Sequence, residues 1–252
     1  MKKPLLSLCA LAVVLASPAL ARAQAYPTEV VLRPLTLPSG MAQLRLDLDI
    51  NMSRNAAGKP IVLAPDLYYG VSSDLTIGVD HVRSLCLSGR ADGCRKTYDD
   101  VGFDLLYSIA RGSVGAAFHG GVYANVLDPV VLQGRVGVLL NIPLSRGKAH
   151  LYLDPQLLLG MNRREEGNRD GLAVPVTFVF QPNQSVAPFI VTGMYGPLDG
   201  FGDAVRIPGG GGVLFAVSSA FDLGASFTFT NLLGKGSSTD YRSLDLFMNV
   251  RF

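Results

Sequence analysis

The residues of this chain that could carry chemistry are few and far apart. The three histidines are His81, His119 and His150. Nucleophilic catalysis needs a nucleophile, a base and a third group that orients the base, all within hydrogen-bond reach. His81 shares its expected outward strand face with Arg83 rather than with a serine, and the other two histidines fall on different expected strands. We therefore expect hydrogen-bonded structural histidines and no enzyme activity.

Two cysteines, Cys86 and Cys94, lie in one polar segment, whereas Cys9 lies in an apolar stretch near the start of the chain. In an exported chain the pair predicts a small-loop disulfide. Because its loop is short, the bond should contribute on the order of 2–3 kcal/mol at most. A metal site is the alternative, but only His81 and Asp92 lie near enough in sequence to add ligands. We expect no metal and no cofactor.

A charged cluster between residues 162 and 170 places Glu165, Glu166 and Asp170 among three arginines. Acidic residues in such a segment can serve a protease, but interleaved charges of both signs favour a solvated loop. The glycine run from Gly209 to Gly212 lacks the lysine and the following helix of a phosphate-binding loop. It indicates a bulge or a bend instead.

The first 23 residues have the composition of an export signal. Two lysines follow Met1, an apolar run spans residues 5–16, and small residues recur where a signal peptidase reads them, at Ala19, Ala21 and Ala23. An uncleaved anchor is the alternative, but the apolar run is too short to span a bilayer. Removing residues 1–23 leaves 19 basic and 20 acidic residues, a net charge of −1. Nothing in this balance indicates nucleic-acid binding.

From residue 41 onward, segments of about ten residues alternate apolar with polar side chains, which predicts strands with two unlike faces. The first such strand includes residues 44–51 and the last includes 243–252. Ten more are expected at 60–72, 75–83, 99–110, 114–126, 131–142, 149–161, 171–181, 185–195, 205–218 and 221–232. No stretch after residue 25 holds 18 consecutive apolar residues, so no spanning helix is expected.

The connections between these strands alternate in length. Short turns are expected at 72–74, 111–113, 143–148, 181–184 and 218–220, and longer polar segments at 52–59, 84–98, 162–170, 195–204 and 233–240. The connection near 127–130 is a short exception. Short turns on one side and long loops on the other are typical of transmembrane barrels, with the short turns periplasmic and the long loops extracellular.

A soluble β-sandwich would also alternate, but its polar faces would be charged. Here only 17% of residues are charged and 48% are hydrophobic. Unpaired backbone groups are costly in lipid, so strands can span only when the sheet closes. The sequence predicts an all-β, closed antiparallel transmembrane β-barrel of about twelve strands over residues 41–252. Three prolines in residues 24–40 exclude a long helix, so this periplasmic N-terminal segment is either a plug or an extra strand.

The alternating strand 241–252 ends in Phe252. In this respect the sequence resembles the bacterial outer-membrane β-barrel class, over residues 41–252 together with the signal peptide. The resemblance implies that Phe252 is recognised by the barrel-assembly machinery, that outer-membrane lipid surrounds the protein, and that its C-terminus is periplasmic. It singles out no family, and the oligomeric state stays open.

Two functions fit such a barrel. One is a narrow passive channel for small solutes, and the other is a non-conducting surface or structural barrel with a filled lumen and contact-making loops. Inward-facing Tyr68, Tyr123, Tyr152 and Phe247 favour filling, whereas many Gly, Ser and Asp residues favour water. The candidate pore-lining residues are Arg45, Asp47, Asp49, Asp66, Asp80, Asp104, His119, Arg135, Asp154 and Asp245. Their acidic excess predicts a weak cation preference.

The position of signal cleavage gives a direct prediction. The mature chain should begin at Gln24 or at Arg22, because small residues precede both sites. N-terminal sequencing of protein isolated from the outer membrane measures this. Recovery of Met1 in that protein would contradict the export signal.

Overall fold

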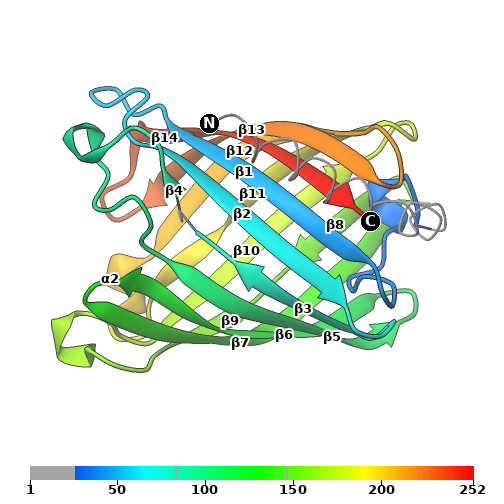
Figure 1. Ribbon diagram of the computed structural model, residues 1–252, viewed down its shortest axis with the longest axis horizontal. Coiled ribbons are helices and arrows are strands. Elements are labelled where there is room, and N and C mark those ends of the chain that lie inside the picture. Colours follow the sequence, from blue (N-terminus) through cyan, green and yellow to red (C-terminus); the bar gives the residue numbers. More distant parts are fainter. Residues whose placement is uncertain (1–25, 83–84, 146) are drawn as a thin grey trace, which may run out of the picture.

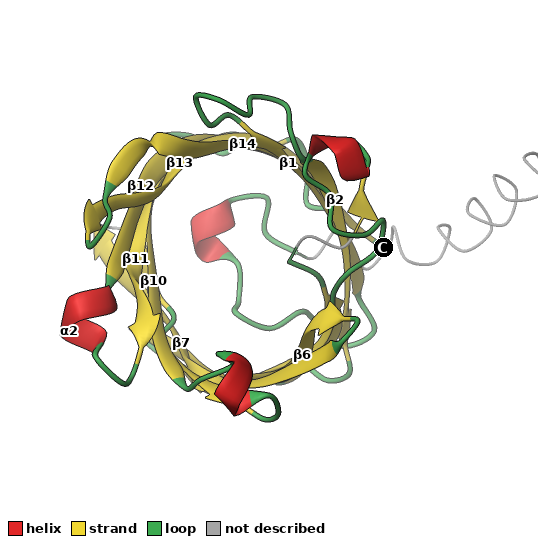
Figure 2. Ribbon diagram, turned by 90° about the vertical axis from the view of Figure 1, so that its left-hand side faces the viewer, coloured by secondary structure: helices red, strands yellow, loops and turns green. Residues whose placement is uncertain are grey.

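The strands of the chain form one closed antiparallel sheet. We describe it from a computed structural model, which describes residues 26–82, 85–145 and 147–252. The expected signal peptide lies outside these residues. In Figure 1 the strands run obliquely along the molecule, and Figure 2, which looks along it, shows them closed into a ring. None of the helices in the described ranges is long and apolar enough to cross a bilayer.

The barrel wall has twelve strand positions, here called staves. Two of the staves are interrupted, so that each consists of two short strands. The strands are β1 (Ala42–Asn51), β2 (Ile61–Gly70), β3 (Leu75–Asp80), β4 (Leu85–Cys86), β5 (Val101–Arg111), β6 (Gly115–Leu127), β7 (Val130–Ser145), β8 (Ala149–Leu153), β9 (Gln156–Gly160), β10 (Gly171–Phe180), β11 (Val186–Pro197), β12 (Arg206–Ala216), β13 (Phe221–Gly234) and β14 (Ser238–Arg251). In the described residues four short helical segments accompany them: η1 (Val30–Leu32), η2 (Arg90–Asp92), η3 (Arg164–Glu166) and α2 (Phe201–Ala204).

Each interrupted stave continues along one path of the sheet. Both β3 and β4 pair with β2, and both β8 and β9 pair with β7 and β10. The second break falls at Pro155, which has no N–H to donate to a ladder. Backbone bonds still reach across it, from Asp154 N to Pro175 O at 3.1 Å and from Val138 N to Pro155 O at 3.2 Å. The interruption is therefore local, and the wall remains continuous.

The observed strands agree with the expected alternation, with one clear exception at the end of the barrel. The segment 233–240, expected as a long loop, is largely strand, because β13 extends to Gly234 and β14 begins at Ser238. Polar residues there continue to pair beyond the apolar band, as in the Asn231–Ser238 pair. The irregularity expected in the glycine run lies just before it, as a register shift between Ile207 and Gly209, and Gly209 to Gly212 themselves pair in regular register.

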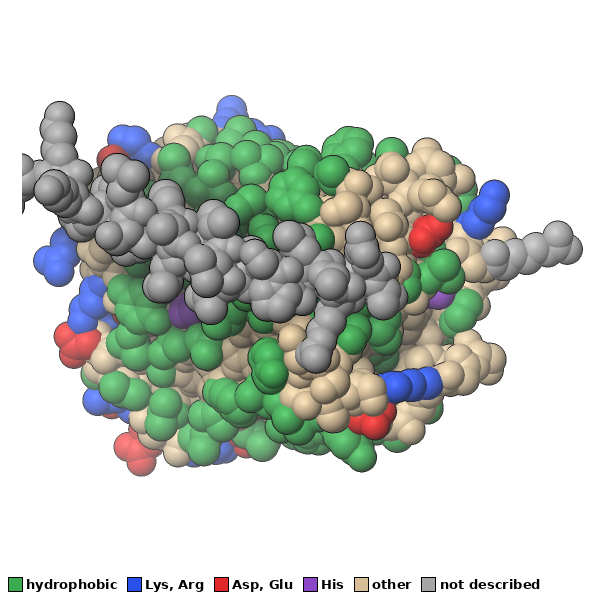
Figure 3. Space-filling view, turned by 45° about the vertical axis from the view of Figure 1, so that its right-hand side comes forward, with side chains coloured by type: hydrophobic (Ala, Val, Ile, Leu, Met, Phe, Trp, Pro, Cys, Tyr) green, Lys and Arg blue, Asp and Glu red, His purple; other side chains and the backbone are tan. Residues whose placement is uncertain are grey.

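The outside of the barrel is apolar and its inside is largely polar. Large hydrophobic side chains such as Leu67, Phe103 and Ile109 are exposed on the outer face. Figure 3 shows hydrophobic side chains over much of this surface and charged ones toward the two ends. Polar residues of the alternate positions, including Asp66 and Asp104, are buried instead. This inversion of a soluble protein's pattern is what a lipid-embedded barrel requires.

The two ends of the barrel differ in their connections. One, here called the short-turn end, carries the turns at 71–74, 112–114, 181–185 and 217–220 and the connection between β7 and β8, and the other is called the long-loop end. The N-terminal segment 26–40 enters at the short-turn end and contains η1. It belongs to none of the described strands, so the extra-strand alternative is wrong.

The barrel closes where β1 pairs with β14. The ladder continues past β14, because Ala42 N donates to Phe252 O at 2.8 Å and Phe252 N donates to Ala42 O at 3.0 Å. The last residue of the chain therefore forms the final pair of the seam. This position adds a structural role to the expected recognition of Phe252.

Deletion of Phe252 should lower outer-membrane levels more than lost burial explains. Removing one phenylalanine from lipid contact costs about 2–3 kcal/mol, and the deletion also removes one seam pair. We expect periplasmic accumulation and degradation in cells, measured by fractionation and immunoblotting. Substitution by Tyr or Leu keeps the backbone pair and serves as the control. Wild-type levels of the deletion variant would argue against a role in assembly.

Candidate functional site in the barrel lumen

The lumen opens at the long-loop end into a wide vestibule. This cavity has a volume of about 990 Å³ and is lined by residues of β1, β2 and β10–β14. Its polar lining includes Asn51, Thr177, Tyr195 and Thr228. Such a volume and such a mixture of hydroxyl, amide and aromatic groups suit a water-filled entrance for small molecules.

A second cavity lies deeper, next to the vestibule. It has a volume of about 410 Å³, and the two share Asp49, Val62, Thr177 and Val191 as lining residues. Its far side is formed by Val30 of η1. The hollow interior thus runs from the long-loop end down to the N-terminal segment.

Acidic side chains follow one side of this interior. Arg45 forms an ion pair with Asp47 at 2.5 Å, and both residues line the deeper cavity. Asp49 and Asp245 line it as well, and Asp245 accepts a hydrogen bond from Ser226 at 2.9 Å. The deeper cavity therefore has more acidic than basic lining residues.

Two further carboxylates on the same side are bound within the wall. Asp66 accepts a hydrogen bond from the backbone N–H of His81 at 2.9 Å, and Asp80 accepts one from the Tyr68 hydroxyl at 3.0 Å. Hydrogen bonds of this kind lower the cost of holding a carboxylate in a poorly solvated place. These two residues support the wall rather than line either cavity described above.

Another polar cluster lies on β5, β6 and β7, with Asp154 joining it from the break between β8 and β9. His119 bridges two carboxylates, with Nδ1 at 2.8 Å from Asp154 and Nε2 at 3.1 Å from Asp104. Asp104 also accepts from the Tyr123 hydroxyl at 2.8 Å, and the Arg135 guanidinium lies 3.7 Å from the centre of the Tyr123 ring. The structure brings these candidates together through contacts that join four neighbouring staves: β5, β6, β7 and the stave of β8 and β9.

Four inward aromatic rings lie against glycines rather than across the lumen. Each ring stands directly opposite a glycine in the strand register, in the pairs Tyr68–Gly78, Tyr123–Gly102, Phe189–Gly212 and Phe247–Gly224. A Cβ added at these glycines would come within 2.1–2.6 Å of the ring atoms. Tyr68, Tyr123 and Phe247 were expected to fill the lumen, as was Tyr152. Because the missing Cβ lets each ring lie on the wall, these rings leave space in the lumen.

Basic residues at the entrance were missed by the sequence analysis. Arg206, Lys235 and Arg242 line the vestibule, whereas Asp49 is the one acidic residue among its described lining residues. Arg206 begins β12, and Arg242 stands opposite Phe229 beside a register shift, where simple alternation no longer assigns faces. The interior is therefore basic at the entrance and acidic farther in.

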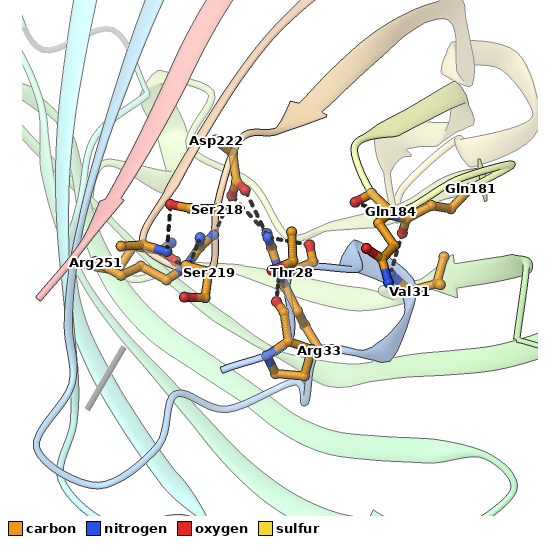
Figure 4. A network of polar contacts seen from close by, with 12 residues as sticks. Thr28, Val31, Arg33, Gln181, Gln184, Ser218, Ser219, Asp222 and Arg251 are labelled. Carbon is orange, nitrogen blue, oxygen red and sulfur yellow. Dashed lines mark hydrogen bonds and ion pairs between the residues drawn. The ribbon is translucent and has the colours of Figure 1, made fainter. Parts of the chain in front are cut away.

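The N-terminal segment joins the wall through a buried ion-pair network, shown in Figure 4. The Arg33 guanidinium donates to both carboxylate oxygens of Asp222 at 2.7 Å, and Arg251 donates to the same carboxylate at 2.6 Å. The Tyr26 ring lies beneath both guanidinium groups, 5.5 Å from Arg33 and 5.1 Å from Arg251. Burial raises the pKa of the Tyr26 hydroxyl, which keeps the ring neutral beside these cations.

The loops carry the remaining expected features. Cys86 and Cys94 form the expected disulfide, with their Cα atoms 5.8 Å apart. In the charged loop, Arg164 pairs with Asp170 at 2.7 Å and lowers the pKa of that carboxyl. His81 does not face outward as expected: its side chain is 8% exposed, lies 3.0 Å from the Tyr98 hydroxyl and lines the deeper cavity. The reason is that β3 ends at Asp80, so strand alternation no longer fixes its direction.

Within the described part of the chain, no group of three or more His, Cys, Asp or Glu side chains is arranged to hold a metal ion. His119 lies between two carboxylates, and each of its ring nitrogens is within hydrogen-bond distance of one of them. The two cavities of the lumen have a charged lining.

The backbone resembles solved outer-membrane channels. It is similar to the NanC porin in a rhombohedral crystal form, at 7% identity and a TM-score of 0.59 over 83% of this chain and 98% of that chain. It is similar to the KdgM porin in complex with disordered oligogalacturonate, at 4% identity and a TM-score of 0.58 over 83% and 99%. The COG4313 outer membrane channel from Pseudomonas putida F1 matches at 10% identity and a TM-score of 0.57 over 86% and 97%.

At these identities the likeness concerns the fold. No protein-family profile matches the sequence, and no curated protein matches it. The fold defines the class: the chain is a closed antiparallel β-barrel of twelve strands, similar in fold to solved outer-membrane porins.

The aromatic–glycine pairs yield a prediction for the wall. Substitution of Gly102 by Ala places a Cβ 2.1 Å from the Tyr123 ring, which is held by Asp104 and Arg135. The ring must leave the wall, and such overpacking typically costs about 1–3 kcal/mol of unfolding free energy. Reversible denaturant unfolding in detergent or vesicles measures this cost. Gly112→Ala, where the added atom meets nothing within 4 Å, is the control, and equal stability of both variants would contradict the packing argument.

Proposed function

We propose that the protein is a narrow passive channel for small polar solutes in the bacterial outer membrane. The observation that carries this proposal is the pair of adjacent cavities, which share lining residues and together extend from the vestibule to η1. The rings that lie on glycines leave this space free. The similar solved structures named above are porins and a channel, which supports transport in general.

The interior charge supports a weak preference for cations. Asp47, Asp49 and Asp245 line the deeper cavity against a single arginine, Arg45. A unit charge about 8 Å away in water attracts another by about 0.5 kcal/mol, roughly a twofold change in ion population. The basic entrance acts in the opposite direction, so the preference should be small. It should also fade at high salt, since the Debye length falls to about 3 Å at 1 M.

A second candidate function is a non-conducting surface barrel whose loops contact other molecules. The segment 26–40 favours it, because this segment lies across the short-turn end. The two candidates differ in one measurable property, which is conductance of the full-length mature protein in a planar bilayer.

Purified protein should conduct small ions in such a bilayer, and reversal potentials across a salt gradient should show weak cation selectivity. The double variant Asp49→Asn with Asp245→Asn should lower the cation-to-anion permeability ratio by about two- to fourfold. Asp66, Asp104 and Asp154 are unsuitable for this purpose, because they hold the wall together.

Glu165→Gln is the matched control, since it removes one negative charge from an exposed loop. It should leave the permeability ratio unchanged. Anion selectivity of the unmodified protein would overturn the charge argument. Absence of conductance in the unmodified protein and in the unlatched variants described below would favour the surface-barrel function.

A further inference from the structure

The short-turn end of the barrel is crossed by the protein's own N-terminal segment. This segment contacts all five short connections or the residues beside them. Thr36 Oγ1 donates to Ser73 O at 2.8 Å, and the backbone N–H of Val31 donates to Gln181 Oε1 at 3.1 Å. Ala220 packs against the buried cluster of Tyr26, Leu37 and Met41.

The remaining two connections are reached by leucine side chains. Leu35 lies beside Gly115 and Leu32 beside Gly147, so that an added Cβ at these glycines would be 3.6 and 4.0 Å from them. Because contacts extend around the whole ring, the segment lies across the opening rather than along one wall. Val30 then forms the inner boundary of the deeper cavity, as described above.

In the described structure the segment 26–40 belongs to no strand; it is held mainly by side-chain contacts, together with a backbone bond from Gly40 N to Gly70 O at 2.7 Å. Arg33 makes the strongest contacts, since it donates to Asp222 twice and also to the carbonyl oxygens of Pro27 and Thr28 at 3.0 and 2.9 Å. It therefore both shapes its own segment and fixes it to β13. Bidentate arginine–carboxylate pairs are among the strongest polar contacts in proteins.

The barrel does not need Arg33 to satisfy its own wall. Asp222 keeps a charge-assisted bond to Arg251 at 2.6 Å, and both residues belong to the barrel strands. Release of Arg33 would leave that pair intact and would remove the excess positive charge of two arginines on one carboxylate. The junction between the segment and β1 is Gly40, whose φ of 76° suits a turning point.

We infer that residues 26–40 form a movable plug that closes the short-turn end, with the Arg33–Asp222 pair as its latch. This inference rests on the proposed channel function for its physiological meaning. The plug itself is a property of the fold, and it can be tested without any measurement of current. Opening means loss of the Arg33 contacts and withdrawal of Val30 and Val31 from the wall of β10–β12.

Cysteine labelling reports on the plug directly. Val31 is 3% exposed and Leu32 is 57% exposed, so Val31→Cys should resist a bulky water-soluble maleimide while Leu32→Cys should react. Adding Arg33→Ala should raise the labelling rate of Val31→Cys about tenfold or more, because tenfold corresponds to about 1.4 kcal/mol, the size of one charge-assisted hydrogen bond. It should leave the rate of Leu32→Cys nearly unchanged.

Arg33→Lys keeps the charge but loses the bidentate geometry. The labelling rate of Val31→Cys in this background should therefore lie between the rates with arginine and with alanine at position 33. If Arg33→Ala does not fold, Gln181→Ala loosens the same segment from the opposite wall without touching the ion pair. Equal protection of Val31→Cys in the folded Arg33→Ala or Gln181→Ala variant would overturn the inference.

Single-channel recordings separate this inference from the channel function. Arg33→Ala should increase the time-averaged current of the folded protein several-fold over that of the unmodified chain. Faster labelling without any current would support the plug and contradict the channel. Equal current and equal labelling in both proteins would contradict the plug and leave the channel function standing.

Discussion

Every backbone N–H and C=O group inside a bilayer needs a partner within the protein, and closure of the sheet meets this requirement here. The seam is the contact on which closure depends. It joins β1 to β14 in continuous register from Gln43–Arg251 to Asn51–Ser243, and the Ala42–Phe252 backbone pair completes it. An open edge would expose a row of unpaired groups to lipid, so the first and last strands must meet for any strand to be stable in the membrane.

Closure determines what the two faces of each strand can be. Alternate side chains must face lipid, and they are large and apolar; the others are enclosed and must satisfy one another or water. The protein satisfies the enclosed side chains through local contacts between neighbouring strands. Carboxylates accept from tyrosine, histidine and backbone donors, and aromatic rings occupy the space above glycines on the neighbouring strand. The result is a thick wall around a connected hollow rather than a packed core.

The N-terminal segment gives the barrel two unlike ends. At the long-loop end the vestibule carries basic residues, and farther in the lining becomes acidic. At the short-turn end Arg33 donates to the Asp222 carboxylate, which already has a partner in Arg251. A contact that the barrel can lose without losing its own pairing is a physical basis for a reversible closure. In the plug that we propose, closure depends on the balance between this latch and the desolvation cost of holding three charged groups together out of water.

The sequence alone determined the fold class and the number of staves, because period-two alternation and closure are local rules read along one strand at a time. It also placed the disulfide, whose cysteines lie in one loop. Tertiary structure decided what depends on register and on distant segments. Gly102 meets Tyr123 only when β5 and β6 are paired, His81 turns inward only because β3 ends before it, and Arg33 meets Asp222 across 189 residues of chain. Such contacts are set by where strands align and where loops bend, and neither is encoded in the alternation of a single strand.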